Sequence, residues 1–169
     1  MGDVLTKLLF ALVAAVFFFI MPVTMLSLNM EQSIQTSIDT LVTDFVDNAR
    51  STATITEKDI NNLYQKIGAY GIVWDIEIKH YSTLQYPTSS GPTEIDYAYT
   101  TMEILEYLYP ADGSYVGVYP LKQGDRIEVT VRNKSDFTGT KLLKAILPQL
   151  GEGTTLYAHH SGIVGNYEE

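Results

Sequence analysis

Residues Leu8 to Met30 read LLFALVAAVFFFIMPVTMLSLNM, a stretch of 23 positions without a charged side chain. As an α-helix rising about 1.5 Å per residue, this stretch would cover roughly 34 Å, enough for a bilayer hydrocarbon core about 30 Å thick. The alternative is a cleaved secretory signal, which needs a basic start, a shorter apolar stretch and a small-x-small cleavage site. Because none of the three is convincing here, we expect residues 1–30 to be a retained membrane helix.

The residues that flank this stretch predict its orientation. Lys7 is the only basic side chain before Arg50, whereas Glu31, Asp39, Asp44 and Asp47 follow the apolar stretch. Since basic residues favour the cytoplasmic side of a membrane helix, we expect the N-terminus inside and the rest of the chain outside the cytoplasm.

Residues 31–53 are expected to continue the same helix as an amphipathic stem. Ile34, Ile38, Leu41 and Phe45 recur at steps of four, three and four, the spacing of one apolar stripe on a helix. We expect these four residues to pack against the head domain that follows the stem. The main flaw in this long helix is Pro22, which should kink it or melt it locally because proline lacks an N–H group and clashes with the preceding turn.

Residues 54–169 are expected to form a small α+β head with about four antiparallel strands. Capping residues Thr56 and Thr100 predict short helices over 57–67, ending at Gly68, and before Pro110. Alternating apolar residues predict strands at 74–78, 115–119, 126–132 and 154–164. Two prolines, a glycine and several hydroxyl residues predict a loop at 82–92, and apolar spacing predicts a last helix over 142–147.

The composition argues against several classes of function. The chain has 20 acidic and 11 basic residues, a net charge of −9, which disfavours nucleic-acid binding because that needs basic surfaces. It has no cysteine, so disulfides and thiolate chemistry are excluded. His159 and His160 would point to opposite faces of a strand, and the remaining histidine is His80, so we expect no metal site.

No catalytic or cofactor motif is present in the sequence. The segment Thr138-Gly139-Thr140-Lys141 ends like a phosphate loop but lacks the earlier glycine. We therefore expect neither an enzyme nor a bound cofactor. The twelve tyrosines suit half-buried core edges, interfaces and sugar-binding patches equally well, and mildly favour an interaction surface.

An apolar N-terminal helix that continues as an amphipathic stem and ends in a small β-containing head is similar to the plan of type IV pilin-like proteins. More specifically, four segments resemble TadE-like pilins and pseudopilins of Gram-positive bacteria. These are FVDNAR at 45–50, ITEKDI at 55–60, LYQKI at 63–67 and GDRIEVTV at 124–131.

The resemblance implies a non-catalytic pilin, a structural subunit held in the cell membrane before assembly and then stacked as a homo-oligomer into a helical extracellular filament. Its partners would be the pilus assembly machinery: a platform protein, a prepilin peptidase and, indirectly, an ATPase. A filament of this kind could serve cell adhesion. The helices would pack in the filament core through Leu8, Phe10, Leu12, Val16, Phe17, Phe19 and Ile20.

One position departs from the family pattern. In type IV pilins a glutamate at the fifth mature position neutralises the N-terminal amine of a neighbour, but this chain has Leu5 there. Asp3 is the only carboxylate near the amine, so we expect Asp3 to take that role, because an unpaired charge in an apolar bundle is costly.

A second hypothesis belongs to a different class. In it the chain is a single-pass membrane-anchored protein whose outer domain binds a ligand or partner and never polymerises. Its site would then lie in the tyrosine-rich segment from Tyr81 to Tyr99.

Overall fold

The protein is described by a computed structural model. It covers residues 2–88, 91–111, 113–114, 116–137, 140–141, 144–145 and 155–165, with side chains except at 2, 16, 84–88 and 91–95. The fold class is α+β, as predicted.

The long N-terminal helix is present as predicted. Helix α1 runs from Gly2 to Thr52 and is uninterrupted at Pro22, so the chain does not melt there, and a kink at this residue stays a prediction. Ala53 ends the helix in a left-handed conformation with φ 51°.

The chain forms two compact units, and α1 contributes to both. The first unit contains residues 1–34 and 136–154, and the second contains residues 35–135 and 155–169. The apolar half of α1 therefore belongs to the first unit and the amphipathic half to the second. The predicted helix over 142–147 lies almost wholly outside the described residues.

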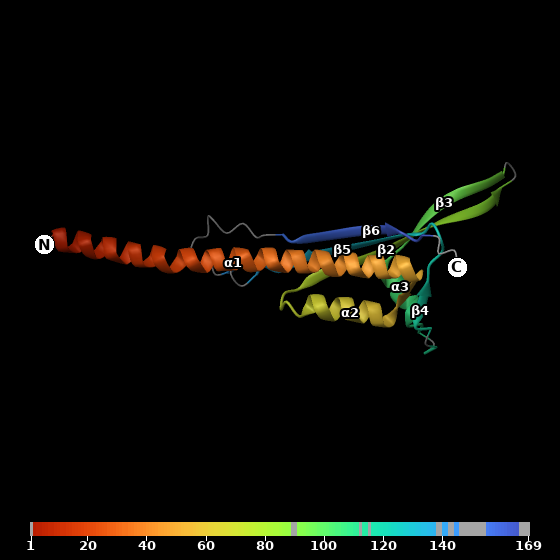
Figure 1. Ribbon diagram of the computed structural model, residues 1–169, viewed down its shortest axis with the longest axis horizontal. Helices are drawn as coiled ribbons and strands as arrows, with labels where there is room; N and C mark the ends of the chain where they lie inside the picture. Colours follow the sequence, from red (N-terminus) through yellow and green to blue (C-terminus); the bar gives the residue numbers. More distant parts are fainter. Residues whose placement is uncertain are drawn as a thin grey trace. The chain divides into compact units, whose positions relative to one another are not determined.

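A four-stranded antiparallel sheet forms the second unit, in the order β3-β2-β5-β6 (Figure 1). Its strands are β2 (Trp74–Thr88), β3 (Gly91–Tyr99), β5 (Arg126–Asn133) and β6 (Tyr157–Ile163). A separate two-stranded ladder joins β1 (Thr54–Thr56) to β4 (Val118–Pro120). Strand β6 lies within the last predicted strand and pairs with β5 along the whole length of β6.

The predicted loop at 82–92 is wrong. Strand β2 continues to Thr88 and β3 returns from Gly91, so the two strands form a long hairpin with Pro87 opposite Pro92. Prolines interrupt a ladder only where their missing N–H is needed, and they are tolerated on edges and near strand ends. Residue 115 of the strand predicted at 115–119 lies outside the described residues. Residues 116 and 117 are not in a strand, and residues 118–120 pair with β1.

Both short helices begin at the predicted caps. In α2 (Glu57–Gly68) the Thr56 hydroxyl accepts from the Asp59 N–H, and the Asp59 carboxylate accepts from the Thr56 N–H. The same reciprocal box joins Thr100 and Glu103 at the start of α3 (Thr101–Leu108). Gly68 does not stop α2 as a left-handed residue but is its last helical position.

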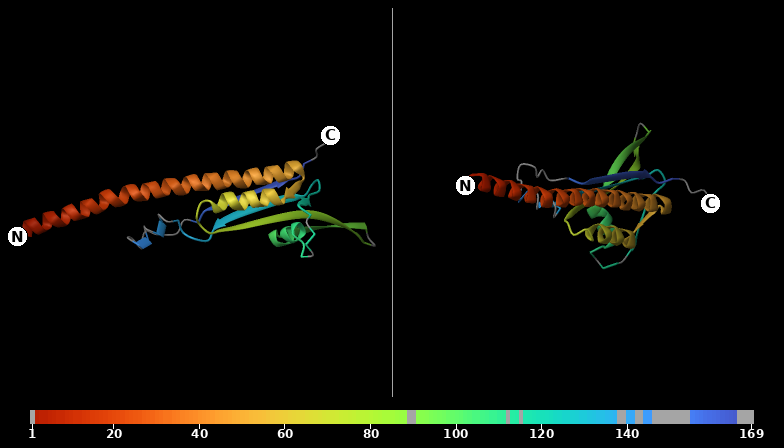
Figure 2. Two further views of the ribbon diagram at one scale, coloured as in Figure 1. Left: turned by 90° about the horizontal axis from the view of Figure 1, so that it is seen from below. Right: turned by 60° about the vertical axis from the view of Figure 1, so that its left-hand side comes forward.

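The core of the second unit lies between one face of the sheet and the helices. Helices α1 and α2 lie on the same side of the sheet (Figure 2), and Asn48 of α1 donates a hydrogen bond to Asp59 of α2. Strand β6 approaches α1 closely, because a Cβ added at Gly162 would lie 3.0 Å from Val46 Cγ1. Three alternating apolar side chains of β5 are fully buried in this core: Ile127, Val129 and Val131.

Helix α3 completes the free edge of β2 beyond the end of β3. The Thr101 hydroxyl accepts a hydrogen bond from the Ile78 N–H at 2.7 Å and donates one to the Ile78 carbonyl at 3.0 Å. One side chain thereby satisfies the two backbone groups that a strand partner would otherwise satisfy, so α3 is fixed beside β2.

Candidate functional site

The apolar half of α1 is the most exposed hydrophobic surface of the first unit. Five of the predicted packing residues have exposed fractions between 60% and 76%: Leu8, Phe10, Leu12, Phe17 and Phe19. Ile20 is half-buried, and the side chain of Val16 lies outside the described residues.

By length and composition this half of the helix can cross a membrane. Its most apolar stretch has a mean hydropathy of 2.6, and none of that stretch is buried within the chain. Soluble proteins rarely leave so large a continuous apolar surface in water, since its hydration is unfavourable in proportion to its area. Lipid or another protein surface is therefore needed to cover it.

Near the start of α1, Asp3 has a partner that the sequence argument did not consider. Lys7 Nζ lies 2.9 Å from Asp3 Oδ2, and both side chains are exposed. A pair four residues apart on an exposed helix face contributes little stability, but it removes net charge from the end of the apolar segment. The role of Asp3 opposite the amine of a neighbouring chain stays a prediction, and Lys7 would compete for it.

Glu31, at the end of the apolar stretch, is buried although it is an acidic side chain. It is 4% exposed, and the Thr140 hydroxyl donates a 2.6 Å hydrogen bond to Glu31 Oε1. The bond joins two segments of the first unit that are 109 residues apart in sequence. Asp125, in the second unit, is a second buried acidic side chain.

In the stem, the structure buries a wider stripe than the sequence argument proposed. Ile34, Ile38 and Phe45 are buried, whereas Leu41 is only half-buried and lines a groove between α1 and α2. Three further residues of α1 that the predicted stripe did not include are at most 2% exposed: Val42, Val46 and Ala49. These three residues are spaced by four and three positions, which also predicts one face of a helix. Val42 and Val46 each lie one position after a residue of the predicted stripe.

The three histidines do not meet at one site. His159 and His160 are neighbours on β6, where His159 Nδ1 lies 3.2 Å from the Thr130 hydroxyl and His160 Nε2 lies 4.0 Å from Asp47. His80 is buried with Asp125 and Tyr119. Within the described part of the chain, no group of three or more histidine, aspartate or glutamate side chains is placed to hold a metal ion.

The fold and these surfaces define an α+β protein with one N-terminal helix that is long and apolar enough to cross a membrane. Comparison with family models, with curated proteins and with solved structures gives no match to this chain. Its function is therefore argued from its own residues.

Proposed function

We propose that this chain is a pilin, a structural subunit of a Tad-like or type IV-like bacterial surface filament. The observation that carries the proposal is the exposed apolar half of α1, which continues without a break into a half that is buried by a folded sheet. In such a subunit the apolar half of the helix would pack against other subunits, and the other half would hold the folded domain that forms the filament surface.

The same apolar surface serves two stages in this proposal. Before assembly it is covered by lipid, which suits a charge-free length of roughly 34 Å. In the filament it is covered by the corresponding helices of neighbouring subunits, through Leu8, Phe10, Leu12, Val16, Phe17, Phe19 and Ile20. Assembly then exchanges lipid contacts for helix contacts, and the platform protein, prepilin peptidase and ATPase of a pilus machine would drive the exchange.

Mechanical shearing of producing cells tests the proposal. We expect sheared supernatants to contain filaments made of an 18.9 kDa species, visible by electron microscopy. Phe17→Asp should abolish these filaments, because it places a carboxylate in the apolar bundle. Tyr64→Asp, at an exposed position on α2, is the matched control and should leave them intact. A parent protein released only by detergent, with no filaments, would contradict the proposal.

Charge pairing at the N-terminus needs its own test. We expect Asp3→Ala to reduce filament yield, whereas Asp39→Ala removes an exposed acid from the same helix and should not. Equal assembly by the parent and Asp3→Ala would end the proposed role of Asp3 and leave the subunit proposal in place.

The alternative function is a membrane-anchored binding protein that does not polymerise. One observation favours it: the second unit has a tyrosine-lined cavity with buried polar groups at its floor. Detergent-only release together with ligand binding at this cavity would select the alternative.

A further inference from the structure

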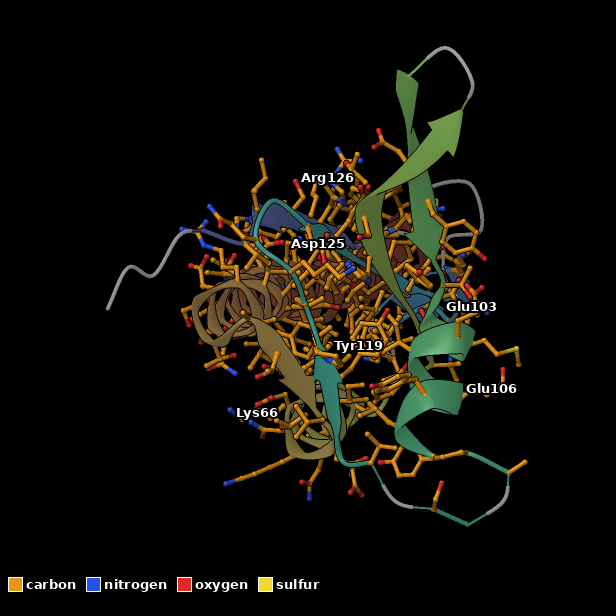
Figure 3. The ribbon with its side chains drawn as sticks, turned by 90° about the vertical axis from the view of Figure 1, so that its right-hand side faces the viewer. Lys66, Glu103, Glu106, Tyr119, Asp125 and Arg126 are labelled. Carbon is orange, nitrogen blue, oxygen red and sulfur yellow. The ribbon has the colours of Figure 1, made fainter. Side chains whose placement is uncertain are left out.

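A cavity of about 340 Å³ opens in the second unit where β2, β3, β4 and α3 meet. This volume lies in the range of small-molecule sites, roughly 300–1,000 Å³. Figure 3 looks onto this end of the unit, where Tyr119 lies between Asp125 and α3, the helix that carries Glu103. No residue of α1, the helix that carries the proposed filament contacts, lines this cavity.

The floor of the cavity is a buried network of three side chains. His80 Nε2 lies 2.8 Å from Asp125 Oδ2, and His80 Nδ1 lies 2.8 Å from the Tyr119 hydroxyl. A carboxylate can only accept, so Nε2 carries a proton and donates it to Asp125, while Nδ1 and the Tyr119 hydroxyl share the second hydrogen bond. The Asp125 carboxylate also accepts from the Lys122 N–H at 2.7 Å, which fixes its position.

This network holds its members in place and is not arranged as a nucleophile. Burial is the main cause that raises the pKa of the Tyr119 phenol, and Tyr99 and Asp125 add to it. A phenol whose proton is held so firmly is a poor source of tyrosinate at neutral pH. The network therefore provides a rigid floor.

One hydroxyl group in the cavity lining can form a hydrogen bond with a ligand. Ser82 lines the cavity two residues beyond His80 on β2 and is 5% exposed. Among the described residues its hydroxyl makes no hydrogen bond, and because Ser82 lines the cavity this hydroxyl can pair with water or with a ligand. A ligand hydroxyl that reached Ser82 would satisfy it.

Aromatic rings form the walls. Tyr99 stacks on His80 with ring centroids 5.2 Å apart, and Tyr107 meets Tyr119 edge to face at 5.1 Å. These contacts fix the rings before any ligand arrives, so little side-chain entropy is lost on binding. Ring faces that are electron-rich attract the weakly positive C–H groups of a ligand.

From this geometry we infer that the cavity binds one neutral, hydroxyl-rich ring, the size of a single sugar unit. Its C–H faces would lie against Tyr99 and Tyr107, and its hydroxyl groups would pair with Ser82 and with the Lys122 ammonium at the rim. The Asp125 carboxylate is already bound by His80 and the Lys122 N–H. One carboxylate, Glu103, and one ammonium, Lys122, therefore remain in the lining. A neutral ligand that both donates and accepts hydrogen bonds fits this mixture of charges best.

The test uses the full chain in polyoxyethylene micelles, whose headgroups carry neither sugar nor ammonium. Saturation-transfer NMR with glucose, galactose, mannose and N-acetylglucosamine measures binding, and tetramethylammonium chloride is the cation probe. We expect saturable binding of at least one sugar and no binding of the cation. Binding of the cation alone, or of none of these compounds, overturns the inference.

Matched variants assign the binding to this cavity. Tyr107 and Tyr109 have exposed fractions of 45% and 43% at the end of α3, but only Tyr107 lines the cavity. We expect Tyr107→Ala to weaken sugar binding about tenfold, equivalent to about 1.4 kcal/mol, and Tyr109→Ala to leave it unchanged. Ser82→Ala should weaken it several-fold with an unchanged Trp74 fluorescence spectrum. Equal affinity in the parent, Tyr107→Ala and Ser82→Ala would also overturn the inference.

Discussion

The two halves of α1 are made of the same backbone but meet opposite surroundings. In the half that belongs to the second unit, Val42 and Val46 have no exposed area, whereas Phe10 and Phe19 in the other half are exposed by about three quarters. The amphipathic half has one apolar stripe, which a sheet and a helix can cover. The apolar half has hydrophobic side chains all round, which a single small domain cannot cover. Function is therefore expected where the chain leaves its own apolar surface uncovered.

The largest expected effect comes from placing a carboxylate in each half. Val46→Asp should destabilise the second unit by roughly 3–5 kcal/mol, because it buries a charge without a partner. Phe19→Asp should leave the unfolding midpoint in urea nearly unchanged, yet oppose membrane insertion by roughly 2.5–3.5 kcal/mol. Urea unfolding followed by Trp74 fluorescence measures the first effect, and flotation with liposomes measures the second. A large loss of fold stability in Phe19→Asp would show that the apolar half is covered by the chain itself.

The division of α1 into an apolar and an amphipathic half could be predicted, because it depends only on local composition and on the spacing of apolar residues. A charge-free stretch and a following 3–4 repeat are local signals, and they correctly located both halves of α1. The capping boxes at Thr56 and Thr100 are local in the same sense, since each joins residues only three positions apart.

What the sequence could not supply were pairings between distant segments. Nothing near Asp125 indicates His80, 45 residues away, and nothing near Glu31 indicates Thr140. The hairpin of β2 and β3 was mistaken for a loop because its prolines and hydroxyl residues are turn formers locally, whereas strand pairing overrides that preference. The cavity could not be predicted for the same reason, since its residues come from β2, β3, α3, β4 and the loop between β4 and β5.

A smaller loss of stability is expected where β6 packs closely against the covered half of α1. At Gly162 an added Cβ would lie 2.9 Å from Arg50 Cδ and 3.0 Å from Val46 Cγ1. Arg50 can move because it is exposed, but the buried Val46 cannot, so Gly162→Ala should cost roughly 1–3 kcal/mol as overpacking does. The control is Gly165→Ala, where an added Cβ meets nothing within 4 Å. Equal urea midpoints for the two variants would mean that β6 does not hold α1 this tightly.

A smaller effect still, and of opposite sign, is expected where the covered half ends. Ala53 has φ 51°, a left-handed conformation that is unfavourable for a residue with a Cβ. Ala53→Gly should therefore stabilise the second unit by about 0.5–1 kcal/mol. Ala69, the C-cap of α2, has φ −62°, so Ala69→Gly should destabilise by a similar amount. If both glycines destabilised, Ala53 would not be left-handed in solution.

The smallest effect distinguishes packing from exposed charge as the source of stability in the covered part of the chain. Hydrogen bonds from the Thr100 N–H, the Thr100 hydroxyl and the Tyr97 hydroxyl lower the pKa of the Glu103 carboxyl. Because the folded-state pKa is the lower one, its contribution is present above the pKa of the unfolded chain and is lost as the pH falls through the folded value. Glu103→Gln keeps a side chain that suits this capping position but cannot titrate. The parent should therefore lose slightly more stability than Glu103→Gln between pH 7 and pH 3, measured by urea unfolding. Parallel pH curves would show that the Glu103 carboxylate adds nothing to the covered part beyond what packing supplies.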